Sequence, residues 1–196
     1  MISNIVLGVF ALLYFMLTGK SDKHWSLFFL FIGLSAFTGA VYHYDVSNGE
    51  IFRFFSWGLL SVALLFALQA TYFYVDNKLL KIFFIFKSLL LLSLAISNAD
   101  FIFMAIDIFI SLMVFIVVGN YIYLHNVSRW KIYGIVISVS SALIFVNQIV
   151  LHKDYLTAND IGHYISVISL FFIMIGVRED SHTEKLSAIF EKRNFS

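Results

Sequence analysis

Seven long apolar segments follow one another along the chain, and they constrain its fold more than any other feature. An apolar run of about 20 residues crosses a bilayer as a helix. The runs cover residues 2–17, 25–43, 51–74, 79–97, 101–124, 130–151 and 161–177. Charged residues make up only 13% of the chain, about half of what a soluble domain carries. The pattern predicts an all-α polytopic membrane protein, a seven-transmembrane-helix bundle.

The short connections between the runs favour a single transmembrane domain over residues 1–177, with sequential helices as antiparallel neighbours. Residues 178–196 form a short charged tail, which either folds as an amphipathic surface helix or stays disordered. The chain has no cysteine, which excludes disulfides and thiolate metal sites. Its net charge of +1 does not suggest a nucleic-acid partner, so the expected partner is membrane lipid.

Basic residues divide unevenly between the two sides of the predicted bundle. Lys and Arg gather in the cytoplasmic loops of membrane proteins. Ten lie on one side, namely Lys20, Lys23, Lys78, Lys81, Arg129, Lys131, Arg178, Lys185, Lys192 and Arg193. Only Arg53 and Lys153 lie on the other side. We therefore predict an external N-terminus and a cytoplasmic C-terminus, in a multi-pass protein of a bacterial inner membrane.

Histidine and acidic residues cluster at the predicted outer ends of the helices. Asn159, Asp160 and His163 open the last apolar run, and their spacing of three and four residues places them on one helix face. His43 ends the second run on the same side of the membrane. Imidazoles and carboxylates are the ligands that zinc takes when thiolates are absent. These residues are either a metal site or ordinary polar residues at the headgroup level.

The second run carries a stripe of small and polar residues that ends at this histidine. Ser35, Gly39 and His43 are spaced by four and share one helix face. Small residues let neighbouring helices approach closely, and Ser35 can form hydrogen bonds between helices. We expect the stripe to face the last helix and present His43 to His163; plain helix packing is the alternative.

The segment Ser35-Ala-Phe-Thr-Gly-Ala-Val-Tyr-His43 resembles the second helix of the alkaline ceramidase-like superfamily. That group contains seven-helix zinc-dependent lipid amide hydrolases and related receptors. The resemblance implies that His43 and His163 match two of the zinc-binding histidines. Asn159 occupies the position of the third, and Gly39 stands where the family has Ser. The family's Asp falls near Phe54, so another group must complete the shell, and Asp160, Asp45 or His152 could do so.

One cation lies near the middle of the fourth run, where a charge is costly. Inserting Lys87 there costs at least about 2.5 kcal/mol, so it is normally paired or faces a cavity. Asp107 in the fifth run lies at a matching depth, and a very short turn joins the two runs. We expect either a structural Lys87–Asp107 pair, snorkelling of Lys87, or a lipid or substrate contact within the bundle.

Together these features lead to one main functional hypothesis and two alternatives. The main hypothesis is a metal-dependent hydrolase of a lipid amide or ester, with Zn²⁺ held by His43, His163 and Asn159. Asp160 and Ser35 are then the candidate catalytic residues. The first alternative is a non-catalytic seven-helix receptor or interaction protein that binds lipid in the same pocket. The second is a small proton-coupled transporter built around Lys87 and Asp107.

Overall fold

The protein is helical throughout the part that the structure describes, with no strand in that part. This computed structural model describes residues 1–44, 49–72, 75, 77–119, 128–149 and 157–194, leaving out the side chains of 183–194. The helices are α1 (Ile2–Thr18), α2 (Lys23–Tyr44), α3 (Gly49–Thr71), α4 (Lys78–Asn98), α5 (Ile102–Ile108), the π-helix η1 (Phe109–Val118), α6 (Arg129–Val146) and α7 (Ala158–Asn194). Within the described residues, each predicted apolar run therefore coincides largely with one helix, or, for residues 101–119, with α5 followed by η1.

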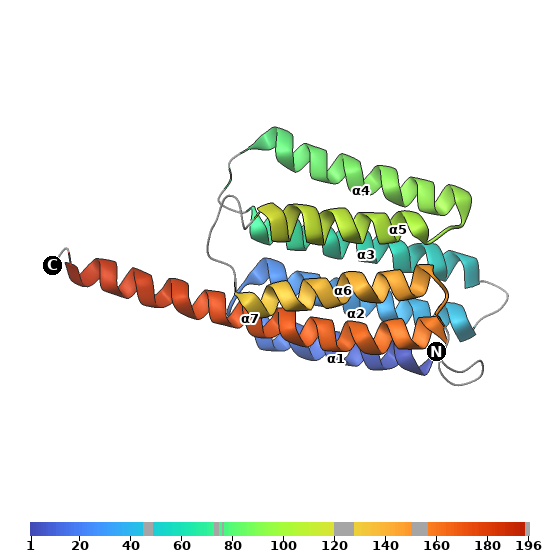
Figure 1. The fold of residues 1–196 in the computed structure, drawn as a ribbon, viewed down its shortest axis with the longest axis horizontal. Coiled ribbons are helices and arrows are strands. Elements are labelled where there is room, and N and C mark those ends of the chain that lie inside the picture. The colour runs from blue at the N-terminus through green and yellow to red at the C-terminus, as the bar shows by residue number, and fades with distance from the viewer. Residues whose placement is uncertain (45–48, 73–74, 76, 120–127, 150–156, 195–196) are drawn as a thin grey trace.

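The helices run side by side in one bundle (Figure 1). α1 packs against both α2 and α7, α2 packs against α3, and α6 packs against α7. α4 lies at the edge, beside α3 and α5. Large apolar side chains such as Phe29, Leu64, Leu68, Ile135 and Ile173 fill the interior almost completely shielded from solvent. This order of packing determines which helix ends can meet.

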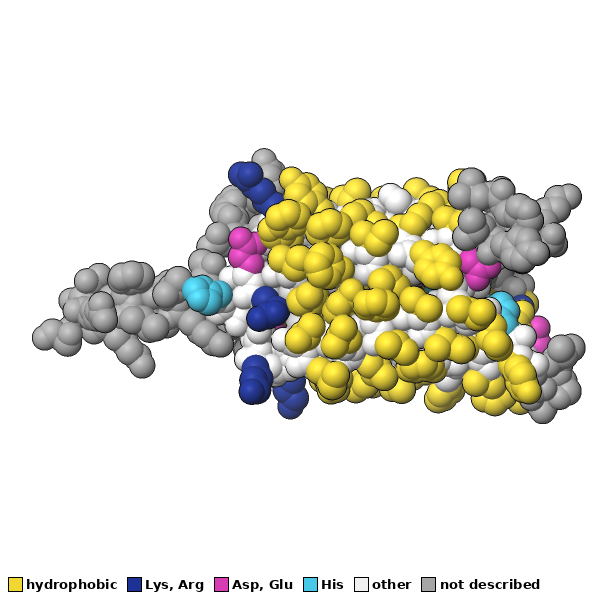
Figure 2. Space-filling model, turned by 90° about the horizontal axis from the view of Figure 1, so that it is seen from below, with side chains coloured by type: hydrophobic (Ala, Val, Ile, Leu, Met, Phe, Trp, Pro, Cys, Tyr) yellow, Lys and Arg dark blue, Asp and Glu magenta, His cyan; other side chains and the backbone are white. Residues whose placement is uncertain are grey.

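Five of the described helices are long and apolar enough to cross a membrane, namely α2, α3, α4, α6 and the Ala158–His182 part of α7. Two shorter apolar helices, Ile2–Thr18 and Ile102–Val118, lie among them. Hydrophobic side chains cover the middle of the bundle surface, whereas Lys and Arg gather at the end from which α7 projects (Figure 2). These properties are compatible with an integral multi-pass membrane protein.

α6 and α7 approach each other unusually closely because small residues face each other along both helices. A Cβ added at Gly134 would lie 2.7 Å from the backbone nitrogen of Ile173, and one at Gly176 would lie 2.5 Å from that of Lys131. The Ser169 hydroxyl donates to the Gly134 carbonyl at 2.8 Å. Such small-residue contacts are typical of membrane helices, where close approach replaces the hydrophobic effect between helices.

The charged tail continues α7 instead of forming a separate element. α7 has 37 residues and ends at Asn194, so it is about 55 Å long, well beyond the hydrocarbon thickness of a bilayer. Its last part projects from the bundle (Figure 1). The backbone therefore differs from the expected surface helix or disordered tail, since the helix is not interrupted after the apolar run.

Candidate functional site

Three helices bring polar side chains together at the end of the bundle opposite the α7 projection. α1 begins at this end beside the start of α7 (Figure 1), and α2 finishes there. Their termini supply Ser3 and Asn4 from α1, His43 from α2, and Asn159, Asp160 and His163 from α7. We call these six residues the outer polar cluster.

Ser3 connects the acidic and imidazole groups of α7. Its hydroxyl donates to Oδ1 of Asp160 at 2.6 Å and lies 3.2 Å from Nδ1 of His163. The other oxygen of Asp160, Oδ2, accepts from the Thr157 hydroxyl at 2.7 Å. Ser3 itself is only 1% exposed, so this set of contacts closes the seam between α1 and α7.

His43 approaches α7 through Asn159, with 3.5 Å between Nε2 of the imidazole and Nδ2 of the amide. His43 is exposed and Asn159 is half-buried. The ionisable groups of His43, His163 and Asp160 lie close enough to interact electrostatically. The residues named from the sequence at this end therefore do gather in one place, at the rim of the bundle.

The expected zinc ion stays a prediction, because further candidate ligands lie outside the described residues. A catalytic zinc takes three protein ligands, and no group of three His, Asp or Glu side chains that could hold a metal occurs in the described part of the chain. Both carboxylate oxygens of Asp160 already accept hydrogen bonds from hydroxyl groups. Two further residues that could complete such a shell, Asp45 and His152, lie outside the described residues.

Ser35 and Gly39 face different neighbours from those that the sequence suggested. The Ser35 hydroxyl donates to the Ser56 carbonyl of α3 at 2.9 Å and lies 3.1 Å from its hydroxyl. A Cβ at Gly39 would meet Oδ1 of Asn4 at 3.0 Å. The stripe therefore faces α3 and α1, not α7, because α1 packs between α2 and α7. Only its last member, His43, reaches α7.

Sequence reasoning missed Ser3 and Asn4, which join α1 to the outer polar cluster. Asn4 is 3% exposed, and its Nδ2 has no hydrogen-bond partner among the described atoms. A buried amide donor without a partner costs about 1–3 kcal/mol. A signal for them was present in the sequence, because two polar residues stand side by side at the start of an apolar run. Positions that face lipid are normally apolar, so this pair indicates a contact with another helix.

The predicted Lys87–Asp107 ion pair is confirmed. Nζ of Lys87 donates to Oδ1 of Asp107 and, at 2.6 Å, to the Ser111 hydroxyl. Ser88 and Ser111 lie 3.4 Å and 3.2 Å from the same carboxylate oxygen. Lys87 is 7% exposed and Asp107 is fully buried, which rules out snorkelling of the lysine to an interface.

The backbone next to this pair is a π-helix, and Oδ2 of Asp107 has no partner among the described atoms. η1 begins two residues after Asp107 and includes Ser111. The hydroxyl of Tyr72, the residue after α3, donates to the Phe115 carbonyl of η1 at 2.7 Å. Gly119 permits this approach, since a Cβ there would clash with the same hydroxyl. π-Helical turns are rare and frequently occur at functional sites.

The site and most of the bundle lie within one protein family. No curated protein and no solved structure matched the chain. A family model described as "Family of unknown function (DUF6962)" matches residues 1–182. This range includes the outer polar cluster and the Lys87–Asp107 pair. That description does not mention alkaline ceramidase-like proteins, so the resemblance stays a prediction. The chain therefore belongs to the DUF6962 family.

Proposed function

We propose that this chain is a seven-helix membrane protein that binds a lipid headgroup at its outer polar cluster without catalysing a reaction. The topology is an external N-terminus and a cytoplasmic C-terminus in a bacterial inner membrane. The two shorter apolar helices count as spans because 17 residues of helix extend about 26 Å, near the hydrocarbon thickness. The distribution of Lys and Arg supports the orientation.

The buried amide of Asn4 is the observation that carries the binding role. Its Nδ2 is a donor with no partner among the described atoms, and its Oδ1 lies against Gly39 of α2. An ester carbonyl, hydroxyl or phosphate oxygen of a headgroup would satisfy this donor. His43 and Asn159 lie at the rim, where further polar atoms of the same headgroup could reach them. Buried donors without a partner are uncommon in native proteins, and a bound acceptor would account for this one.

The hydrolase hypothesis has weaker support from the same geometry. Activation of water by zinc requires a metal with three ligands and an open position. The Asp160 carboxylate accepts from Ser3 and Thr157 at the contact of α1 with α7, whereas Ser35 contacts Ser56 of α3, so the two candidate catalytic residues lie at different helix contacts. Lipid binding, in contrast, requires no metal and uses the hydrogen-bonding groups that the outer polar cluster already presents.

Lipid retention and metal content of the purified protein test this proposal together. We expect co-purified phospholipid without stoichiometric metal, and we expect Asn4→Leu and His43→Ala to lower the retained lipid severalfold. Asn98→Leu is the matched control, because Asn98 is an exposed residue that ends α4 and bonds only within its own helix. Stoichiometric zinc that is lost in His43→Ala would instead support the hydrolase. Equal lipid in Asn4→Leu and Asn98→Leu would refute the binding role.

A proton-coupled carrier is the second candidate, and the unpartnered Oδ2 of Asp107 beside a π-helix favours it. Ionisable groups at this depth are a hallmark of proton pathways. Reconstituted vesicles with an imposed pH gradient would then show a flux that Asp107→Asn abolishes. If neither the unmodified protein nor Asp107→Asn showed a flux that depends on the pH gradient, the carrier function would be excluded. The Lys87–Asp107 pair would then be a structural element.

A further inference from the structure

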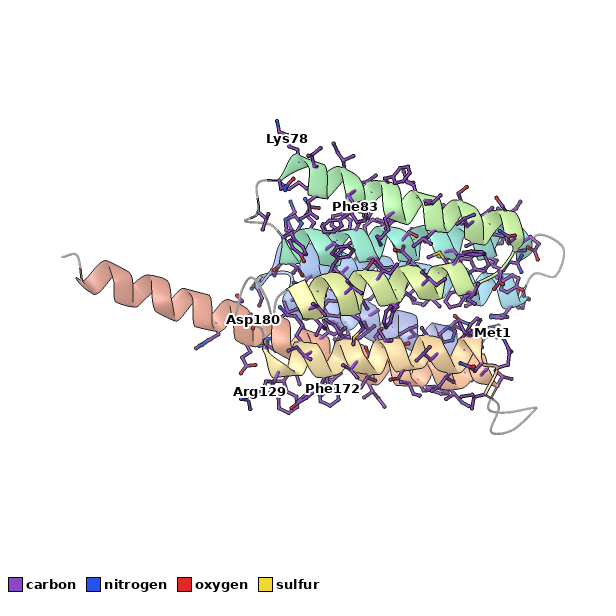
Figure 3. All side chains as sticks on the ribbon, turned by 45° about the horizontal axis from the view of Figure 1, so that its top comes forward. Met1, Lys78, Phe83, Arg129, Phe172 and Asp180 are labelled. Carbon is purple, nitrogen blue, oxygen red and sulfur yellow. The ribbon has the colours of Figure 1, made fainter. Side chains whose placement is uncertain are left out.

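An open depression lies at the basic end of the bundle, between the start of α6 and the middle of α7. Its volume is about 440 Å³, and its lining residues are Trp130, Met174, Ile175, Arg178 and Glu179. Arg129, Phe172 and Asp180 lie in the same region, where α6 begins beside α7 (Figure 3). This end is remote from the outer polar cluster, so the depression belongs to neither site described above.

The depression crosses the boundary between the apolar and charged parts of α7. Met174 and Ile175 belong to the apolar run, and Arg178 follows one helical turn later on the same face. The Trp130 ring is stacked on Phe172, with ring centroids 5.6 Å apart and planes 3° from parallel. An indole held in this way at the end of a membrane helix is typical of the headgroup level.

The charges around the depression leave its mouth positive. Asp180 forms an ion pair with Lys131 and accepts from the Ser128 amide at 2.9 Å, and Glu179 accepts from the Ser128 hydroxyl. Arg129 and Arg178 are both exposed. In the described part of the chain, neither of these arginines forms an ion pair. The nearby acids are thus engaged in joining α6 to α7, whereas the two guanidinium groups are available to an anion.

We propose that this depression binds an anionic phospholipid, with its phosphate on Arg178 and an acyl chain against Met174, Ile175 and Trp130. An apolar floor below a guanidinium matches the order of groups along a phospholipid, from chain to phosphate. Arg donates in a planar fork that suits phosphate oxygens. A net negative headgroup adds attraction to Arg129, which a zwitterionic headgroup offsets with its own cation. The site therefore discriminates between lipids by headgroup charge.

Tryptophan fluorescence in lipid nanodiscs provides a direct test. Trp25 and Trp57 are 2% and 8% exposed, whereas Trp130 is 42% exposed, so lipid-borne bromine should quench mainly Trp130. We expect brominated phosphatidylglycerol to quench at about fivefold lower mole fraction than brominated phosphatidylcholine, as one basic contact implies. Trp130→Phe should remove the quenched component. Arg178→Ala should abolish the lipid preference, and Lys20→Ala, which removes an exposed cation at the same end, should retain it.

Equal quenching by the two lipids in the unmodified protein would overturn the proposal. A preference that survives Arg178→Ala, or that is lost equally in Lys20→Ala, would also overturn it, because it would then reflect the general positive field of this end. A quenched component that survives Trp130→Phe would place the lipid elsewhere and have the same consequence. The variants leave Asn4 and His43 intact, so failure here is distinct from failure of the outer lipid site.

Discussion

At the scale of single residues, the buried Lys87–Asp107 pair places two opposite charges in the interior of the described bundle. Both charges are removed from water, and the hydroxyls of Ser88 and Ser111 supply the remaining contacts. Replacing a buried pair by apolar residues is often neutral, but removing one partner leaves an uncompensated charge. The pair therefore specifies the register of α4 against α5 more than it adds net stability.

A double-mutant cycle tests this account. We expect Lys87→Met and Asp107→Leu to lower the free energy of unfolding by about 3–5 kcal/mol each, because each leaves one buried charge unpaired. The double variant should lose much less than the sum of the two. Thermal unfolding in detergent measures the effect. Lys81→Met, an exposed cation on the same helix, is the control and should change stability little; additive losses would contradict the pairing.

Ser3 provides a second test at this scale, in the outer polar cluster. Ser3→Ala removes the hydroxyl that donates to Asp160 and contacts His163. We expect a loss of about 1–3 kcal/mol, since a half-buried carboxylate loses a charge-assisted hydrogen bond. Ser140→Ala is the matched control, because the exposed Ser140 bonds only to a carbonyl of its own helix. Equal unfolding temperatures for the two variants would show that Ser3 does not join α1 to α7.

At the scale of helices, the contact of α6 with α7 depends on two positions that have no side chain. Gly134 and Gly176 allow the backbones to approach more closely than any Cβ would permit. The hydroxyls of Ser141 and Ser169 then reach carbonyl groups across the interface, at Gly162 (2.6 Å) and Gly134 (2.8 Å). The same interface aligns Trp130 with α7, so it also shapes the depression proposed to bind lipid.

Adding one methyl group at this interface should therefore be costly. We expect Gly176→Ala to lower the free energy of unfolding by about 1–3 kcal/mol, because its Cβ would overlap the Lys131 backbone and force the helices apart. Gly58→Ala in α3 is the matched control. A Cβ at Gly58 meets nothing within 4 Å, and Ala favours a helix over Gly by about 1 kcal/mol. The unfolding temperature should therefore fall in Gly176→Ala and rise in Gly58→Ala. A higher unfolding temperature for Gly176→Ala would contradict the close contact of α6 with α7.

At the scale of the whole molecule, charge and polarity separate along the bundle axis. Basic side chains gather at the end from which α7 projects, whereas His43 and Asp160 lie at the opposite end. Between them lies an apolar surface suited to lipid (Figure 2). In a bilayer, this arrangement would place the two proposed lipid sites in opposite leaflets.

Fusion reporters test the orientation. A reporter fused after Ser196 should behave as cytoplasmic, and one inserted between Tyr44 and Glu50 should behave as external, because most basic residues lie at the C-terminal side. Paired reporters active in opposite compartments, one periplasmic and one cytoplasmic, measure both positions. The reverse pattern would move the outer polar cluster to the cytoplasmic face.

The sequence alone predicted the helical segments, and it gave the buried ion pair as one of three possible roles for Lys87. Twenty-residue apolar runs have few alternatives to helices in a bilayer, since every backbone group must be satisfied within the segment. Lys87 and Asp107 were predictable as partners because a short turn makes their helices adjacent and places both residues at a similar depth. The same reasoning about depth predicted that His43 would meet His163, whereas the contact that His43 makes with α7 is with Asn159.

Only the tertiary structure decided which neighbour each helix face meets. Helical periodicity groups Ser35, Gly39 and His43 on one face, but it carries no information about what that face packs against. α1 packs against both α2 and α7, so Ser35 and Gly39 meet α3 and α1, and Ser3 of α1 donates to Asp160. Packing order depends on contacts between residues far apart in the chain, which a local pattern does not encode.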